Sequence, residues 1–240
     1  MYIFIQKIVS IKNIIYQHAL NILFPPVCVA CLAIIKDQRT YICPPCFDKI
    51  SIHTTHTCPA CGKRKAGKDP CHKTPYTLAA ACHYHEPIPE LIHYFKYKKL
   101  EAIHLILSAL LIVHAQKTVP HIQSYCVSYI PLHPRKERER GFNQSRILAQ
   151  TVADYFHIPC IALLKRKKYT QSQTKQKGYT ERHNNIQHCF VCIDSKNITG
   201  KNIIIVDDVC TSGATLYEAT KTIRLYHPRH IIGLVVAKVE

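Results

Sequence analysis

Apolar residues in the first 24 positions recur at intervals of three or four, which predicts an amphipathic helix. They are Phe4, Ile8, Ile11, Ile15, Ala19 and Ile22. Lys7 and Lys12 interrupt the apolar positions too early for a membrane span, and prolines at positions 25 and 26 end the pattern. We expect this helix to pack against the rest of the protein; contact with a membrane surface is the alternative.

From residue 76 onwards, strand-like and helical patterns alternate. Strand-like runs cover 78–84, 125–132, 160–164, 203–206 and 231–239, and helical patterns cover 87–99, 101–116, 143–156 and a stretch that ends at about 226. The β-branched run at 203–206 is typical of a strand buried on both faces of a parallel sheet. The alternation predicts an α/β domain, in which helices flank a parallel sheet.

The intervening region holds three CxxC pairs, each beginning fifteen residues after the last. Two thiolates from one tight turn occupy adjacent corners of a Zn²⁺ tetrahedron, and a second such turn completes it. The cysteines that we assign to structural zinc are Cys28, Cys31, Cys43, Cys46, Cys58, Cys61 and Cys71. The simplest arrangement is a zinc ribbon with the first four on one ion, although a crossed pairing is also consistent with the spacing.

A second zinc site would begin with Cys58, Cys61 and Cys71, and its fourth ligand is open between His72 and Cys82. Cys82 is the poorer candidate because it lies in a strand-like run. Redox chemistry is the competing interpretation of the CxxC pairs, but three repeats favour a structural role. Clustered cysteines without a cleavable signal sequence indicate a reducing cytoplasm.

The strand at 203–206 leads directly into two acids and a short, hydroxyl-rich turn. Asp207 and Asp208 can accept hydrogen bonds from a ribose diol or hold Mg²⁺ through water. The turn places small side chains and backbone N–H groups where a helix begins, which suits a phosphate. Its residues are Val209, Cys210, Thr211, Ser212, Gly213, Ala214 and Thr215. A sugar phosphate satisfies both halves; the alternative is a buried strand that happens to end in two acids.

Two further stretches concentrate positive charge. Residues 133–143 (HPRKERERGFN) are expected to form a polar loop at the carboxyl end of a strand, where α/β proteins place ligand contacts. The connection 165–188 carries seven Lys or Arg and one acid, which predicts a cationic flap over polyphosphate. The competing interpretations are solvated surface charge and a disordered insertion. The residues that we assign to pyrophosphate or nucleic acid are Arg138, Arg140, Gly141, Asn143, Gln144, Lys167, Lys168, Gln173 and Arg182.

The overall charge favours an anionic partner. Lys and Arg number 32 against 15 acids, which gives a net charge of +17. Nucleic acid, phosphorylated metabolites and an acidic membrane face are all compatible with this excess.

Four segments, taken in order, resemble a known family. Residues 206–215 (VDDVCTSGAT) closely resemble the motif that binds 5-phosphoribosyl-1-pyrophosphate (PRPP) in type I phosphoribosyltransferases. The CxxC pairs, LIHYFKYKK at 91–99 and IPLHPRKERERGFNQSRILAQ at 130–150 precede it, as in the ComF family of competence-associated proteins. Five further residues fall at ComF positions: Thr170, Gln173, Arg182, Asn185 and Phe190. The family usually has a zinc-binding cysteine where this chain has Thr74. This departure removes one of the ligands that the second zinc has in the family.

The resemblance implies a zinc-ribbon part, a type I phosphoribosyltransferase-like part and a role in the uptake of transforming DNA. We expect an N-terminal helix at 1–26, a zinc ribbon at 27–75 and the phosphoribosyltransferase-like domain at 76–240. Asp207 and Asp208 would hold the ribose hydroxyls, with Mg²⁺ bridging to the pyrophosphate. The expected partners are PRPP, single-stranded DNA and the DNA-uptake machinery, such as a helicase or membrane channel, in the cytoplasm or at the inner membrane face.

Two functions of different classes follow from these features. The first is a binding module for DNA uptake, in which bases stack on tyrosines near basic residues: Tyr94, Tyr97, Tyr169 and Tyr179. The second is an enzyme that transfers the phosphoribosyl group to an unidentified base or amine, for which the sequence indicates no acceptor pocket. A regulator that senses PRPP without turnover is a third possibility.

Overall fold

The structure is a computed structural model that describes residues 25–35, 41–65, 72, 74–97, 103–168 and 187–239. The predicted helix at 1–24, Cys71 and most of the predicted flap lie outside the described residues. The chain divides into two compact units, Met1–Lys49 and Ile50–Glu240. No described helix combines the length and the apolar character that a membrane span requires.

The first unit is built around a tight turn and a short helix. An antiparallel bridge joins Val27 to Ile34 and closes the turn that carries the first CxxC pair. The helix α2 (Pro44–Phe47) follows the first cysteine of the next pair. Proline is favoured at such a position because the first N–H groups of a helix have no partner within it.

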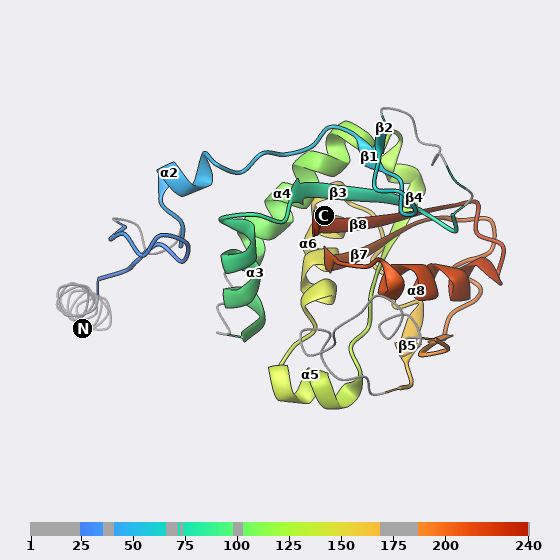
Figure 1. Cartoon of the computed structure of the whole chain (residues 1–240). Helices are drawn as coiled ribbons and strands as arrows, with labels where there is room; N and C mark the ends of the chain where they lie inside the picture. The colour runs from blue at the N-terminus through green and yellow to red at the C-terminus, as the bar shows by residue number, and fades with distance from the viewer. Residues whose placement is uncertain are drawn as a thin grey trace, which may run out of the picture. The chain divides into compact units, whose positions relative to one another are not determined.

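The second unit contains a six-stranded sheet whose centre is parallel, as predicted (Figure 1). Four parallel strands lie in the order β3 (Thr77–His83), β8 (His230–Lys238), β7 (Asn202–Cys210) and β4 (Tyr125–Tyr129). The short strands β1 (His56–Thr57) and β2 (Arg64–Lys65) extend the sheet antiparallel beyond β3. A separate antiparallel pair consists of β5 (Leu164–Arg166) and β6 (Phe190–Cys192).

Helices cover both faces of this sheet (Figure 1). On one face, α4 (Ile103–Thr118) packs on β3 and β8, and α6 (Gln144–Phe156) packs on β4 and β7. On the other face lies α8 (Ala214–Arg224), which contacts β7 and β6. The helix α3 (Ile88–Tyr97) packs against α4, and a short 3₁₀ turn (Ile122–Ser124) leads into β4.

The central strand β7 is buried on both faces, which confirms the interpretation of residues 203–206. Ile203 and Ile205 join an apolar core with Leu216 and Ile223 of α8. Because side chains alternate along a strand, Ile204 faces the α6 side. All four residues of the run are fully inaccessible to solvent. This burial fixes the register of β7, and with it the position of the acids that follow.

Two sequence predictions were wrong in detail. The stretch 133–143 is not an irregular loop, because residues Pro134–Arg140 form the helix α5. The His133 ring accepts a hydrogen bond from the backbone N–H of Arg135, and Gly141 ends the helix with a φ of 92°, a value that glycine adopts readily. The strand predicted at 160–164 is shifted, since only an isolated bridge occurs at Cys160 and β5 begins at Leu164.

Candidate functional site

The two adjacent acids lie near the carboxyl end of β7, and each has a partner from a different helix. Ser145, in the first turn of α6, donates a hydrogen bond of 2.8 Å to Asp207 Oδ1. Lys96, in the last turn of α3, places its Nζ 2.7 Å from Asp208 Oδ1. Residues far apart in the sequence therefore converge on the acid pair. Neither Ser145 nor Lys96 was among the predicted site residues.

Asp207 has an unusual protonation equilibrium. Its removal from water, together with the negative charge of Asp208, raises the pKa of Asp207 to about 7. The hydrogen bonds from Ser145 and from the Asp208 backbone N–H, as well as the charge of Lys96, act in the opposite direction. This carboxyl group consequently changes its charge near neutral pH.

The turn after β7 leads directly into the helix α8, as the sequence predicted. Gly213 has a φ of 77° and precedes the first residue of α8, so a left-handed conformation rather than lack of space explains the glycine. A small pocket lies over the turn, and its lining comes from the acid, the strand end and the helix start. The lining residues are Asp207, Val209, Cys210, Thr211, Gly213, Ala214, Thr215 and Leu216. Seven predicted site residues therefore share one hollow; Ser212 lies in the same turn, where its Oγ accepts from the Ala214 N–H.

The predicted residues of the 133–143 stretch divide into exposed and structural ones. Arg138 is exposed on α5, whereas the guanidinium of Arg140 donates to Gln144 Oε1. Asn143 caps α6 by accepting from the Arg146 N–H and anchors the segment by donating to the Ile130 carbonyl. Of this group, Arg138 and Arg140 carry the charge that a phosphate would require.

The last turn of α3 contacts this segment as well as the acid pair. Three successive residues of the helix have partners in three places: Phe95 with Phe142, Lys96 with Asp208, and Tyr97 with Arg140. The Arg140 guanidinium carbon lies 5.4 Å from the centre of the Tyr97 ring, a cation–π distance. The end of α3 therefore contacts both Asp208 and the segment 140–142, where α5 ends.

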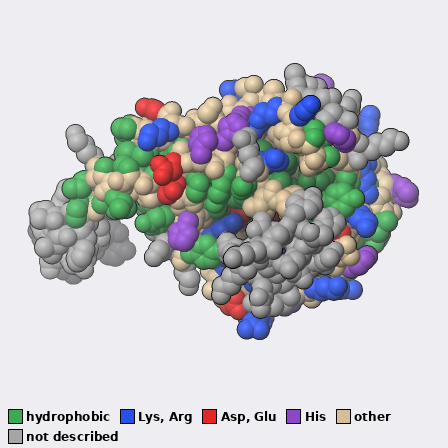
Figure 2. Space-filling view, viewed as in Figure 1, with side chains coloured by type: hydrophobic (Ala, Val, Ile, Leu, Met, Phe, Trp, Pro, Cys, Tyr) green, Lys and Arg blue, Asp and Glu red, His purple; other side chains and the backbone are tan. Residues whose placement is uncertain are grey.

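A second cationic region lies between α5 and β5. Lys136 is half-buried there, and burial, followed by the charges of Arg166 and Arg140, lowers its pKa to about 8. A cleft of about 230 Å³ opens beside it, lined by Arg146, Lys165 and Arg166 together with the apolar Pro131. On the face shown in Figure 2, basic side chains outnumber acidic ones. Three basic residues and one acid, Glu137, line the cleft, and this excess of positive charge suits a polyanion.

The predicted cationic flap is only partly described. Lys167 and Lys168 are exposed directly after β5, and Lys168 Nζ donates to the carbonyl of Gln187 at 3.2 Å. The far end of the connection is tied to α8, because the His188 N–H donates to Glu218 at 2.6 Å. Gln173 and Arg182 lie outside the described residues, so their roles stay predictions.

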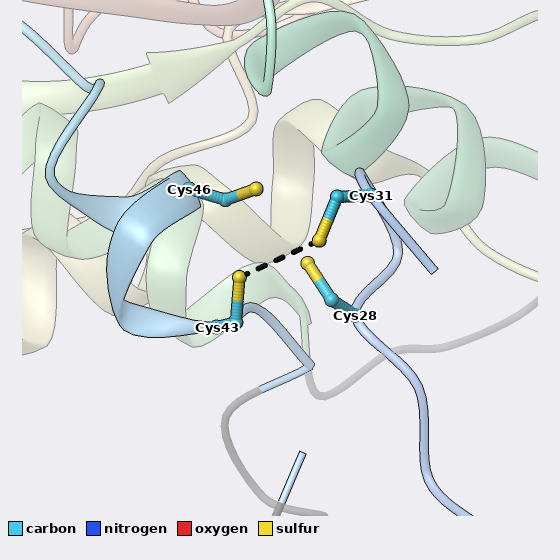
Figure 3. Close-up of side chains that lie close together, drawn as sticks. All are labelled: Cys28, Cys31, Cys43 and Cys46. Atoms are coloured by element: carbon cyan, nitrogen blue, oxygen red, sulfur yellow. Dashed lines mark hydrogen bonds between the residues drawn. The ribbon is translucent and has the colours of Figure 1, made fainter. Parts of the chain in front are cut away.

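The first two CxxC pairs converge in the first unit (Figure 3). The four sulfur atoms lie within 4.8 Å of one another, and those of Cys31 and Cys43 are 3.5 Å apart. Tetrahedral Zn²⁺ with Zn–S bonds of about 2.3 Å separates its sulfur ligands by about 3.8 Å. The cluster fits a structural zinc site. It corresponds to the simpler predicted arrangement, in which the first two CxxC pairs bind one ion.

The thiols of this cluster cannot all ionise without a cation. Burial opposes ionisation of Cys28, but backbone hydrogen bonds from Cys31, Cys43 and Ala30 prevail and lower its pKa to about 6. Burial and hydrogen bonds with the neighbouring sulfurs raise the pKa of Cys46 to about 12. A divalent ion at the centre would compensate the charge of all four thiolates.

The third CxxC pair repeats the turn of the first pair. The backbone N–H of Cys58 donates to the Lys63 carbonyl, and that of Gly62 donates to the Cys58 carbonyl. The same two bonds occur thirty residues earlier, where the Cys28 N–H donates to the Ala33 carbonyl and the Leu32 N–H donates to the Cys28 carbonyl. This turn therefore presents its two sulfurs as the first pair does.

The structure also distinguishes the candidates for the other ligands of the second site. His72 Nδ1 lies 3.5 Å from Cys58 Sγ, and the two residues form a potential metal-binding group with Cys61. Cys82 is buried in β3 outside this group, and burial raises its pKa to about 12. His72 is therefore the better candidate, whereas Cys71 lies outside the described residues.

Comparisons with known proteins identify two domain families in the chain. Residues 19–75 match the double zinc ribbon domain, and residues 143–239 match the phosphoribosyl transferase domain. Among solved structures, an adenine phosphoribosyltransferase is 14% identical and aligns over 60% of this chain and 74% of that one, with a TM-score of 0.39.

Three curated relatives are similar in sequence. Competence protein F of Haemophilus influenzae is 31% identical over 59% of this chain and 64% of its own length. DNA utilization protein YhgH of Escherichia coli K12 is 27% identical over 80% of this chain and 81% of its own. Competence protein ComFC of Bacillus subtilis is 39% identical over 38% of this chain and 35% of its own. The match thus spans just under two thirds of the Haemophilus protein and about a third of the Bacillus protein.

Proposed function

Because this chain belongs to the ComF family of competence-associated proteins, we propose that it binds PRPP with Mg²⁺ and contacts single-stranded DNA during the uptake of transforming DNA. The observation that carries the PRPP proposal is the arrangement at the end of β7, where Asp207, next to Asp208, and the Gly213 turn border one pocket. Carboxylates suit the ribose hydroxyls and the turn suits the 5-phosphate.

The pyrophosphate of PRPP would extend toward α3 and α5. Arg140 supplies a cation there, held by Tyr97 and Gln144. Mg²⁺ would neutralise part of the pyrophosphate charge through its oxygen ligands. The protein residues then have to orient the ligand and compensate the remaining charge.

Titration calorimetry tests the PRPP site directly. The zinc-loaded chain is titrated with PRPP in the presence of Mg²⁺, and the same titration is made with the double variant Asp207→Asn, Asp208→Asn. We expect saturable binding by the wild type and a loss of at least ten-fold in affinity for the variant, since both ribose acceptors lose their charge. Absence of binding at millimolar PRPP would contradict the proposal.

The contact with single-stranded DNA is supported by the cleft beside α5. Its basic side chains can pair with phosphates, and Tyr129 and Pro131 line it with rings against which a base can pack. Repeating the PRPP titration with saturating short single-stranded DNA tests whether the two ligands are coupled. A changed PRPP affinity would join both activities in one mechanism, which we place in the cytoplasm, at or near the uptake machinery.

An active phosphoribosyltransferase is the second candidate function, and Asp207 favours it. A carboxyl group whose pKa is about 7 can accept a proton at neutral pH, as a general base must. Release of pyrophosphate from PRPP, assayed with each common nucleobase as acceptor, distinguishes the two. Turnover that Asp207→Asn abolishes would establish the enzyme, and tight PRPP binding without turnover would favour a binding or sensing role.

A further inference from the structure

The ion pair between Lys96 and Asp208 occupies the place where a bound ribose would need one of its acceptors. The pair is short, at 2.7 Å, and the two side chains are only 21% and 11% exposed. A pair so shielded from solvent is costly to break unless another charge replaces the lost partner. PRPP carries such a charge.

The chemistry of PRPP places its pyrophosphate next to this lysine. The pyrophosphate is attached to C1 of the ribose. The neighbouring carbon carries one of the hydroxyls that would donate a hydrogen bond to Asp208. An ammonium group within hydrogen-bond distance of Asp208 is therefore close to the pyrophosphate as well. Arg140, whose guanidinium lies over the ring of Tyr97, supplies a second cation.

We infer that Lys96 is a pyrophosphate-binding residue that changes partner: its ammonium leaves Asp208 for the pyrophosphate of PRPP, and ribose hydroxyls replace it on the carboxylate. This inference rests on the proposed PRPP site. Before the ligand arrives, the ammonium offsets the repulsion between the adjacent carboxylates, so Lys96 also prepares the site. No covalent bond changes in this exchange.

Docking of α3 does not depend on this ion pair. Ile88, Leu91, Ile92 and Phe95 are at most 3% exposed and hold the helix on its apolar side. Lys96 can therefore move without detaching the helix. An anchored helix with a mobile terminal side chain is what a partner exchange requires.

The test measures three ligands on three variants of the full, zinc-loaded chain in the presence of Mg²⁺. The ligands are PRPP, inorganic pyrophosphate and ribose 5-phosphate, each titrated by calorimetry. Lys96→Met removes the charge and keeps most of the side-chain volume, and Lys96→Arg keeps the charge. Lys117→Met is the matched control. It lies in the last turn of α4, which precedes the amino end of β4, whereas the candidate site lies at the carboxyl ends of the strands.

We expect Lys96→Met to weaken PRPP and pyrophosphate binding at least ten-fold, because a charge-assisted contact is lost. Ribose 5-phosphate should bind to Lys96→Met at least as tightly as to the wild type, because the variant has no ion pair that must break. Lys96→Arg should retain most of the PRPP affinity, and Lys117→Met all of it. Zinc content and circular dichroism verify that each variant folds.

Two results would overturn the inference while leaving the PRPP site intact. One is an equal loss of PRPP and ribose 5-phosphate affinity in Lys96→Met, which would make the lysine a structural support of the ribose site. The other is unchanged PRPP affinity. A wild-type chain that binds neither sugar phosphate would instead refute the site itself, and the inference with it.

Discussion

Ser145 Oγ and Asp207 Oδ1 are joined by a hydrogen bond of 2.8 Å that ties the start of α6 to the end of β7. The same carboxylate oxygen also accepts from the backbone N–H of Asp208 at 2.9 Å. Both donors favour the ionised form of Asp207 and oppose the burial that raises its pKa. The serine therefore helps to set the pH at which this carboxylate takes the ionised form that the proposed ribose site requires.

Replacing this serine should move the pH dependence of ligand binding. We expect PRPP affinity to rise as Asp207 ionises around pH 7. In Ser145→Ala the rise should occur about one to two pH units higher, because a hydrogen bond to a charged acceptor is worth about 1.5–3 kcal/mol. Calorimetric titrations between pH 6 and 9 measure the midpoint. Thr151→Ala removes a hydroxyl from the same helix and should leave the midpoint in place; equal shifts in both variants would contradict the assignment.

Asp207 should also make the ligand-free fold less stable at high pH. Its folded-state pKa of about 7 lies above the ordinary value of 3.8. The folded chain therefore binds the proton more tightly, so stability is greatest below the ordinary value and is lost as the pH rises through about 7. Asp207→Asn, which cannot ionise, should raise the melting temperature at pH 8 by at least about 3 °C more than at pH 5.

The control for this stability experiment is Asp154→Asn, which alters an exposed carboxylate on α6. It should change the melting temperature by similar small amounts at both pH values. A pH-independent effect of Asp207→Asn would mean that the buried carboxylate is already ionised at pH 5. The opposing contributions of Ser145 and Lys96 would then outweigh burial.

The local features of the site could be predicted from the sequence, whereas its long-range contacts could not. Strand β7 and the turn at Gly213 follow from a β-branched run and a residue that tolerates positive φ. Asp208 and Lys96 are 112 residues apart, and no pattern around Lys96 distinguishes a partner for Asp208 from a cation that suits a helix end. Their contact depends on the position of α3, which tertiary packing determines.

The helix α5 is a different case, because its signals were present in the sequence. His133 and Pro134 mark a helix start and Gly141 marks an end. The alternating charges between them indicated a solvated loop, although Arg135 and Glu139 form an i,i+4 pair at 3.1 Å that is typical of an exposed helix. The order of strands in the sheet had no such local signal.

Removing one cysteine of the first cluster should affect only the first unit. We expect Cys43→Ser to lower the zinc content by one ion per chain and to expose residues 25–49 to proteolysis, because Zn²⁺ supplies much of the folding energy of such a small unit. PRPP affinity should stay within about two-fold, a change of less than 0.5 kcal/mol. Cys192→Ser, in β6 outside both clusters, should keep its zinc.

The second zinc site should depend on His72. Elemental analysis of His72→Ala is expected to show one zinc ion fewer per chain than the wild type, since the imidazole lies beside Cys58 and Cys61. Adding Thr74→Cys to this variant should restore the ion, because a thiolate is an equivalent ligand. Unchanged zinc in His72→Ala would assign the site to other residues, and a zinc content of one in the wild type would mean that the second turn holds no metal.

The salt dependence of single-stranded DNA binding tests the cleft between α5 and β5. Each phosphate contact contributes about 0.7 to the slope of log affinity against log salt concentration for single strands. Arg146→Gln with Lys165→Gln should therefore reduce that slope by about 1.4 if both side chains contact phosphates.

The control is the double variant Lys117→Gln, Lys221→Gln, which removes the same charge from exposed positions on α4 and α8, outside the cleft lining. If both double variants reduce the slope equally, the net positive charge of the protein attracts the DNA and the cleft makes no specific contribution. If only the first does, DNA occupies the edge of the sheet next to the end of β4 and leaves the acid pair at the end of β7 available for PRPP.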